Sequence, residues 1–192
     1  MDLTILREQY KKQGIPVLLD ESLAFLIEIL KNKNPKNILE IGCACGTTSI
    51  EMLQACENAK ITVMEKDRNM LDYAVANFSM FNVSERVTVI SGDALIKIRE
   101  ISEKFDFIFL DGPKGQYKNF LPYIKNLLNI GGVLVCDNVL FRGYVNSERE
   151  VPKKYKTLVQ NLRIFNKLLA EDTDFETRIY ETGDGVSVSK KM

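Results

Sequence analysis

The stretch FDFIFLDGPKGQYKNFLPYIKNLLNIGGVLVCDN, residues 105–138, carries the pattern that decides the fold. FDFIFL (105–110) and VLVC (133–136) are apolar at successive positions, which predicts two strands buried on both faces. The segment Tyr117–Leu128 between them is predicted to be a helix. A strand, a helix and a second buried strand in this order predict two parallel strands joined by a right-handed crossover.

The same alternation extends outward in both directions. A further helix is expected after Pro152, and the turn ETGDG between strands 175–180 and 186–189 predicts a β-hairpin. The prediction is an α/β, Rossmann-like fold with a doubly wound, mostly parallel sheet that ends in an antiparallel hairpin. We expect a single domain over 1–192, with an N-terminal helical cap (1–35) and a core (36–192). Before residue 105, helices are expected at 19–30, 47–56, 69–81 and 93–101, and strands at 37–41, 60–64 and 86–90.

The composition excludes several classes of protein. With 45% hydrophobic and 27% charged residues and no long apolar run, the chain is predicted to be cytoplasmic, without a membrane partner. The absence of histidine excludes catalytic triads and metal sites that need an imidazole. The four cysteines form no C-x-x-C pair, so we expect reduced thiols.

A glycine-containing loop, EIGCACG at 40–46, follows the first core strand. Gly42 and Gly46 let the backbone approach a ligand, and the next helix presents its N-terminus there. Ala44 occupies the middle position of the G-x-G-x-x-G dinucleotide motif, which disfavours NAD. The loop therefore indicates either a nucleotide site of another kind or an ordinary strand–helix turn.

Acidic residues also follow the second and third strands. Glu65 lies where a carboxylate can accept hydrogen bonds from ribose hydroxyls, although NAD enzymes use the same contact and an exposed pair with Lys66 is an alternative. Asp93, in the triplet Gly92–Asp93–Ala94, could accept a hydrogen bond from an adenine amino group, cap the next helix, or do both.

The ends of strands four and five carry the most specific pattern. Strand four runs into Asp111-Gly112-Pro113-Lys114, and strand five into Asp137-Asn138. Ligands of open α/β sheets bind beyond the carboxyl ends of the strands, so these side chains should meet there. Two carboxylates and an amide are the hard oxygen donors that Mg²⁺ takes, and Lys114 would reach a metal-bound hydroxyl. Either motif alone could be a solvated loop acid.

With these motifs the chain resembles the catechol and caffeoyl-CoA O-methyltransferase family over residues 16–190, within the class I methyltransferase fold. The resemblance implies S-adenosylmethionine as methyl donor, Asp111, Asp137 and Asn138 as ligands of Mg²⁺ or another divalent cation, and Lys114 as general base. The implied cofactor contacts are Leu18, Glu40, Gly42, Thr48, Glu65, Asp93, Ala94 and Asp111.

More narrowly, DGPKGQY (111–117), DNVLFRGYV (137–145) and GDGVSVSKK (183–191) resemble the bacterial branch that methylates 5-hydroxyuridine at the tRNA wobble position. That branch implies the anticodon region of tRNA as partner, 5-methoxyuridine as product, and a homodimer. The acceptor would present a hydroxyl beside a carbonyl, a vicinal oxygen pair like that of a catechol.

The charge distribution bears on the acceptor. Net charge is zero, yet residues 142–167 hold seven cations against two acids. Such an excess suits RNA phosphates, although it could also be a solvated helix face. Two other functions stay open: methylation of a small catechol-like phenol, and nucleotide binding without catalysis. The candidate RNA contacts are Arg142, Lys153, Lys154 and Lys156.

Overall fold

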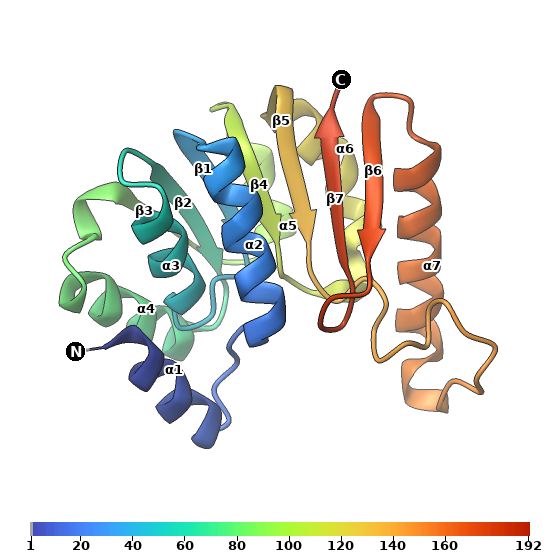
Figure 1. The fold of residues 1–192 in the computed structure, drawn as a ribbon, viewed down its shortest axis with the longest axis horizontal. Coiled ribbons are helices and arrows are strands. Elements are labelled where there is room, and N and C mark those ends of the chain that lie inside the picture. Colours follow the sequence, from blue (N-terminus) through green and yellow to red (C-terminus); the bar gives the residue numbers. More distant parts are fainter. Residues whose placement is uncertain (1) are drawn as a thin grey trace.

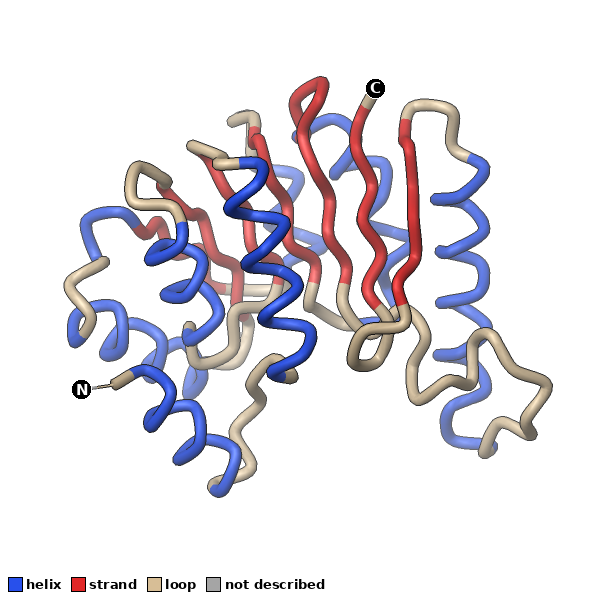
Figure 2. The backbone as a smooth tube through the Cα atoms, viewed as in Figure 1, coloured by secondary structure: helices blue, strands red, loops and turns tan. Residues whose placement is uncertain are grey.

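The computed structural model of the protein describes residues 2–192, and strands alternate with helices along most of the chain (Figure 2). The helices are α1 (Leu3–Lys12), α2 (Asp20–Lys33), α3 (Thr47–Ala55), α4 (Arg68–Met80), α5 (Ala94–Lys97), α6 (Tyr117–Leu127) and α7 (Lys156–Glu171). The strands are β1 (Asn37–Ile41), β2 (Lys60–Glu65), β3 (Val87–Ser91), β4 (Phe105–Leu110), β5 (Leu128–Cys136), β6 (Phe175–Tyr180) and β7 (Val186–Lys191).

All seven strands form one sheet in the order β3-β2-β1-β4-β5-β7-β6. The pairs among β1 to β5 are parallel, whereas β7 is antiparallel to both β5 and β6. The predicted fold, a parallel sheet finished by a hairpin, is confirmed. The order reverses between β1 and β4, and the crevice at such a reversal is where open α/β sheets bind ligands.

Helices cover both faces of the sheet, with α2 and α3 in front of it and α5 and α6 behind it in Figure 1. Side chains of β4 alternate between the layers: Phe107 and Phe109 join one core cluster, whereas Ile108 and Leu110 join the other. The first cluster takes residues from α1 to α4, and the second from α6 and α7. This explains why the strand is apolar at successive positions.

Local signals place the helix ends. Asp67 precedes α4 and accepts hydrogen bonds from the amides of Asn69 and Met70, which satisfies two of the helix's free N–H groups. Helix α2 is terminated by Asn34, the residue after Lys33, which adopts a left-handed conformation with φ of +47°. Helix α1 lies within the expected N-terminal cap and buries Leu3, Leu6 and Tyr10.

Two elements differ from their predicted form. The expected helix 93–101 is a short α5 followed by a 3-10 turn at Ile98–Glu100. Strand β5 begins five residues earlier than predicted, because Gly131 (φ +72°) allows an irregular start before the regular pairing at Val133. Within residues 2–192, no helix is long and apolar enough to cross a membrane.

Candidate active site

A cavity of about 580 Å³ opens at the carboxyl ends of β1, β2, β4 and β5. It brings together the ligands predicted for a metal with most of those predicted for the cofactor. The wall opposite the sheet is the segment Pro16–Leu19, which connects α1 to α2. Of the predicted site residues, the cavity is lined by Leu18, Gly42, Thr48, Glu65, Asp93, Ala94, Asp111, Lys114, Asp137 and Asn138.

The glycine loop leaves β1 at Gly42, with φ of +92°. A Cβ atom at this position would lie 2.7 Å from the carbonyl oxygen of Asp111 and 2.9 Å from the Cα of Gly112. Gly42 is therefore required because the ends of β1 and β4 approach too closely for any side chain. Gly46 also has a positive φ and leads into α3.

The Glu65 carboxylate is held by backbone amides at the end of β2. One oxygen accepts hydrogen bonds from Lys66 and Asp67 at 2.8 Å each, and the other accepts from Ala44 in the glycine loop at 3.0 Å. The carboxylate is thus fixed in the cavity wall, and its remaining lone pair can accept a hydrogen bond from a ribose hydroxyl. Asp93 caps α5 by accepting a hydrogen bond from the amide of Leu95, so its predicted capping role is confirmed. It also lines the cavity, where a contact with an adenine amino group stays a prediction.

Glu40 lies behind the loop rather than in the cavity wall. It is only 1% exposed, and its carboxyl group accepts a hydrogen bond from the Ser49 hydroxyl of α3. Burial raises the pKa of Glu40 to about 8, and the negative charges of Asp111 and Glu65 add to this shift while Ser49 opposes it. A direct contact of Glu40 with a cofactor stays a prediction that the geometry does not favour.

The end of β4 and the end of β5 bring the predicted catalytic residues together. The Lys114 ammonium lies 2.8 Å from Oδ1 of Asp111. Asp137 is 2% exposed, and burial together with the charge of Asp111 raises its pKa to about 7. Burial also raises the pKa of Asp111, while Lys114 opposes the shift. A buried carboxyl and a partly buried one that repel each other attract a proton or a cation.

The donor set fits a divalent cation. Oδ1 of Asp137 is buried and has no hydrogen-bond partner within residues 2–192, although the Ser22 hydroxyl is near enough to this carboxyl to oppose the rise of its pKa. Asn138 adopts a left-handed conformation with φ of +58°, and it lines the cavity beside Asp137. No cluster of three acidic, cysteine or histidine side chains occurs in the described part of the chain, so the predicted set depends on the amide of Asn138. Mg²⁺ commonly uses so few protein oxygens.

Tyr117, which was not among the predicted site residues, connects the two strand ends. Its side chain is fully buried, and its hydroxyl lies 3.0 Å from the carbonyl oxygen of Leu110 and 3.1 Å from that of Asp137. The hydroxyl hydrogen is shared between these acceptors. Tyr117 was assigned only to a helix, because nothing in an amphipathic pattern reveals that its hydroxyl reaches two strand ends.

Among the cavity residues that were not predicted, two come from parts of the fold to which no site residue was assigned. Met70, on α4, and Asp184, in the β6–β7 turn, both line the cavity. The turn is placed there because the carbonyl of Asp184 accepts hydrogen bonds from the amides of Leu140 and Phe141. The Gly- and Asp-rich composition predicted the turn but not its position beside the site.

The predicted RNA contacts do not line the cavity. They belong to the segment 142–156, which projects from the same end of the sheet (Figure 1). Arg142 and Lys154 lie over the ring of Tyr155, at 5.6 and 4.7 Å from its centroid. Arg163, one of the seven cations counted in this region, instead donates to the carbonyls of Tyr144, Val145 and Ser147. Part of the charge excess therefore stabilises the segment itself.

Comparisons with known proteins agree with this geometry. The family model for O-methyltransferases matches residues 4–192. A caffeoyl-CoA O-methyltransferase of Populus kitakamiensis is 30% identical over 93% of this chain and 79% of its own length. Tapetum-specific methyltransferase 1 of Arabidopsis thaliana is also 30% identical, over 94% and 79%.

Solved structures show the same fold. A Staphylococcus aureus protein assigned as a candidate caffeoyl-CoA O-methyltransferase matches 100% of this chain and 93% of its own, with a TM-score of 0.93 and 27% identity. The SAH-bound Podospora anserina methyltransferase PaMTH1 has a TM-score of 0.90 and 24% identity over 100% of this chain and 88% of its own. The chain therefore belongs to the O-methyltransferase family, among the S-adenosylmethionine-dependent class I enzymes that resemble caffeoyl-CoA O-methyltransferase.

Proposed function

We propose that the protein transfers the methyl group of S-adenosylmethionine to a hydroxyl that has a second oxygen beside it, with the help of a divalent cation. One observation carries the proposal. The buried Oδ1 of Asp137, for which residues 2–192 supply no hydrogen-bond partner, belongs to the same cavity as Asp111, Asn138 and Lys114, and the glycine loop and Glu65 line that cavity too. A donor site and an oxygen-rich acceptor site therefore share one enclosed space.

The donor half of the cavity binds the nucleoside. Glu65 is oriented by three backbone amides to accept hydrogen bonds from ribose hydroxyls. Gly42 lines the cavity without a side chain, so the backbone there can approach the amino-acid portion of the donor. Leu18 and Met70 contribute apolar surface to the cavity wall. These contacts fix the direction of the sulfonium, and correct orientation supplies much of the rate of a methyl transfer.

The acceptor half holds the hydroxyl and its proton. When bound to Asp111, Asp137 and Asn138, a divalent cation supplies Lewis-acid activation of the acceptor oxygen. Lys114 lies beside Asp111, so its nitrogen, once it is a neutral amine, is placed to receive the hydroxyl proton during the transfer and becomes the ammonium. The carbon–oxygen bond forms as the carbon–sulfur bond breaks, and S-adenosylhomocysteine leaves with the sulfur electron pair.

A small phenol with two neighbouring oxygens is the acceptor that the relatives support. Both curated relatives cover most of this chain, and one of them is named for caffeoyl-CoA. The acceptor would place both oxygens toward the cation site formed by Asp111 and Asp137. The test is incubation of the protein with S-adenosylmethionine, Mg²⁺ and a panel of catechols including caffeoyl-CoA. Formation of the monomethyl ether, and its loss with a chelator, is expected. Absence of product with every vicinal acceptor, RNA included, would refute the proposal.

The tRNA wobble 5-hydroxyuridine is the second candidate, favoured by the exposed cations stacked on Tyr155. Cations and aromatic rings together suit RNA phosphates and bases. Replacing Lys153, Lys154 and Lys156 by glutamine should weaken tRNA binding and flatten its salt dependence, while methylation of a small phenol is unchanged. Mass analysis of tRNA nucleosides for 5-methoxyuridine decides between the acceptors. Unchanged tRNA affinity and salt dependence would remove this second candidate.

A further inference from the structure

The wall Pro16–Leu19 of the donor cavity has few backbone contacts of its own. The chain leaves α1 with hydrogen bonds from Gly14 and Ile15 back to the helix, and regular bonding resumes only at the carbonyl of Leu19 in α2. Between these points, within residues 2–192, the backbone makes two hydrogen bonds. The Cys45 thiol donates to Pro16 at 3.6 Å, and the Arg7 guanidinium donates to Leu18 at 2.7 Å.

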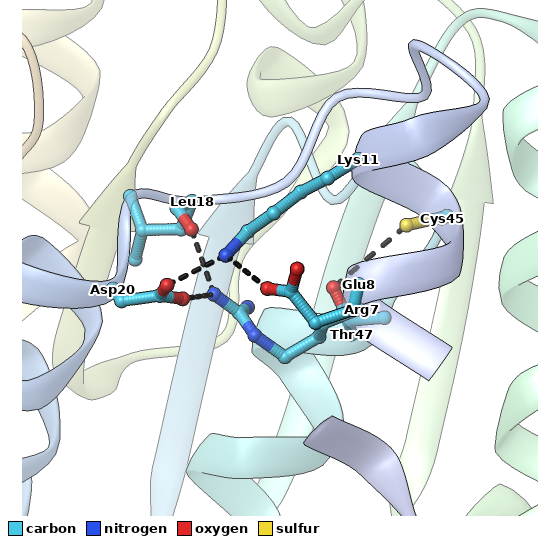
Figure 3. Close-up of polar contacts among 7 residues, drawn as sticks. All are labelled: Arg7, Glu8, Lys11, Leu18, Asp20, Cys45 and Thr47. Atoms are coloured by element: carbon cyan, nitrogen blue, oxygen red, sulfur yellow. Dashed lines mark hydrogen bonds and ion pairs between the residues drawn. The ribbon is translucent and has the colours of Figure 1, made fainter. Parts of the chain in front are cut away.

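The Arg7 contact is the stronger of the two. A thiol is a weak donor, whereas a guanidinium forms charge-assisted hydrogen bonds. Figure 3 shows the Arg7 side chain reaching from α1 to the carbonyl of Leu18 and the carboxylate of Asp20. Its Nη2 makes both contacts, while Nη1 is buried without a partner in the described part of the chain. The strongest polar contact of the wall therefore comes from one nitrogen of one side chain.

Burial distinguishes Arg7 from its neighbour Lys11. Both side chains pair with Asp20, at 2.8 and 2.6 Å, but the Arg7 side chain is 3% exposed and that of Lys11 is 30% exposed. Asp20 itself is 67% exposed, so water screens the ion pairs and they contribute little to stability. The buried hydrogen bond to Leu18 has no such screening. It is the contact that only Arg7 makes.

Helix α1 is itself fixed against the glycine loop. Tyr10 forms a buried hydrogen bond with Asn77 of α4, and the amide of Asn77 donates to the carbonyl of Cys45 at 2.8 Å. Arg7 and Tyr10 lie three residues apart on the same helix, so α1 links the Pro16–Leu19 segment to the glycine loop. A rigid helix can hold the wall at a set distance from the loop.

We propose that Arg7 is a positioning residue for the methyl donor. By holding the Leu18 carbonyl, it keeps the Pro16–Leu19 wall closed on the donor cavity, so the affinity for S-adenosylmethionine depends on it. This inference rests on the proposed function in one respect, that the donor binds in this cavity. Arg7 touches neither the donor nor the acceptor half, so turnover at saturating donor should not depend on it.

The test compares Arg7→Met with Lys11→Met, because both changes remove a cation of α1 that pairs with Asp20. Binding of S-adenosylhomocysteine is measured by calorimetry at 20 °C, and the KM for S-adenosylmethionine and kcat are measured separately. We expect about 10-fold weaker binding and a similar rise in KM for Arg7→Met, the scale of one charged hydrogen bond. For Lys11→Met we expect less than about 2-fold change. The kcat values of both should stay within about 2-fold of the unmodified protein.

The outcomes separate the inference from the proposed function. If the unmodified protein fails to bind S-adenosylhomocysteine, the proposed function is refuted. If it binds and Arg7→Met binds equally well, or if kcat falls while affinity is unchanged, the positioning role is refuted. Should Arg7→Met not fold, Arg7→Lys decides. Its single nitrogen is drawn to the Asp20 carboxylate and leaves the Leu18 carbonyl, so about 3-fold or more weaker binding is expected and unchanged binding refutes the role.

Discussion

Replacement of Gly42 by alanine should disturb the fold and the site together. The new methyl group would lie 2.7 Å from the carbonyl oxygen of Asp111 and 2.9 Å from the Cα of Gly112, and both neighbours are backbone. Backbone cannot move aside as a flexible side chain can. The strand end that carries Asp111 must therefore shift, or β1 must separate from β4.

The expected loss of folding free energy in Gly42→Ala has two contributions. A side chain at the positive φ of Gly42 costs about 1–2 kcal/mol, and an overpacked contact in a buried region costs about 1–3 kcal/mol more. The free energy of unfolding should fall by about 2–5 kcal/mol. For a chain of this length that corresponds to a fall in Tm of about 4–20 °C.

Gly14→Ala is the matched control. Gly14 has φ of +72°, and a Cβ atom there would meet nothing within 4 Å. The Gly14→Ala variant should lose only the about 1–2 kcal/mol that a side chain costs at positive φ, and its kcat should be unchanged. Thermal melting and turnover with S-adenosylmethionine are measured for both variants. If Gly42→Ala melts no lower than Gly14→Ala and turns over as fast, the close approach of the two strand ends has no consequence and the reasoning is wrong.

Three further predictions concern single side chains in and behind the cavity. Lys114→Met should lower kcat by about 10²–10⁴-fold, the usual contribution of a general base, with little change in S-adenosylhomocysteine affinity by calorimetry; a collapse of that affinity with turnover preserved would contradict the assignment. Asp137→Ala should abolish Mg²⁺-dependent turnover while leaving the melting temperature close to normal, because it removes a carboxyl disfavoured by burial; full activity in a chelator would exclude the metal role. Glu40 has a native pKa of about 8 against an ordinary 4.5, so the folded state holds its proton more tightly, and stability from this group falls as pH rises through that interval. Urea unfolding at pH 5 and pH 8 should show a smaller difference for Glu40→Gln than for the unmodified protein, and an equal difference would refute the shifted pKa.

The architecture could be predicted because its signals are local. FDFIFL became β4 with the predicted bounds, since a strand buried on both faces must be apolar throughout. The segment 93–101 was predicted as one helix, yet α5 already ends at Lys97, its fifth residue. Apolar periodicity does not distinguish an α-helix from a 3-10 turn in so short a segment. The homodimer, the tRNA partner and the cation stay predictions.

The sequence by itself determined that Asp111, Lys114, Asp137 and Asn138 lie at one edge of the sheet. They directly follow parallel strands, and parallel strands end on the same side. It also determined the family, which the motifs at those ends identify. Only the tertiary structure decided that Tyr117 joins two of these ends and that Arg7 fixes the opposite wall of the cavity. Such contacts join residues on different elements, and no spacing along the chain records which side chains meet once the elements have packed.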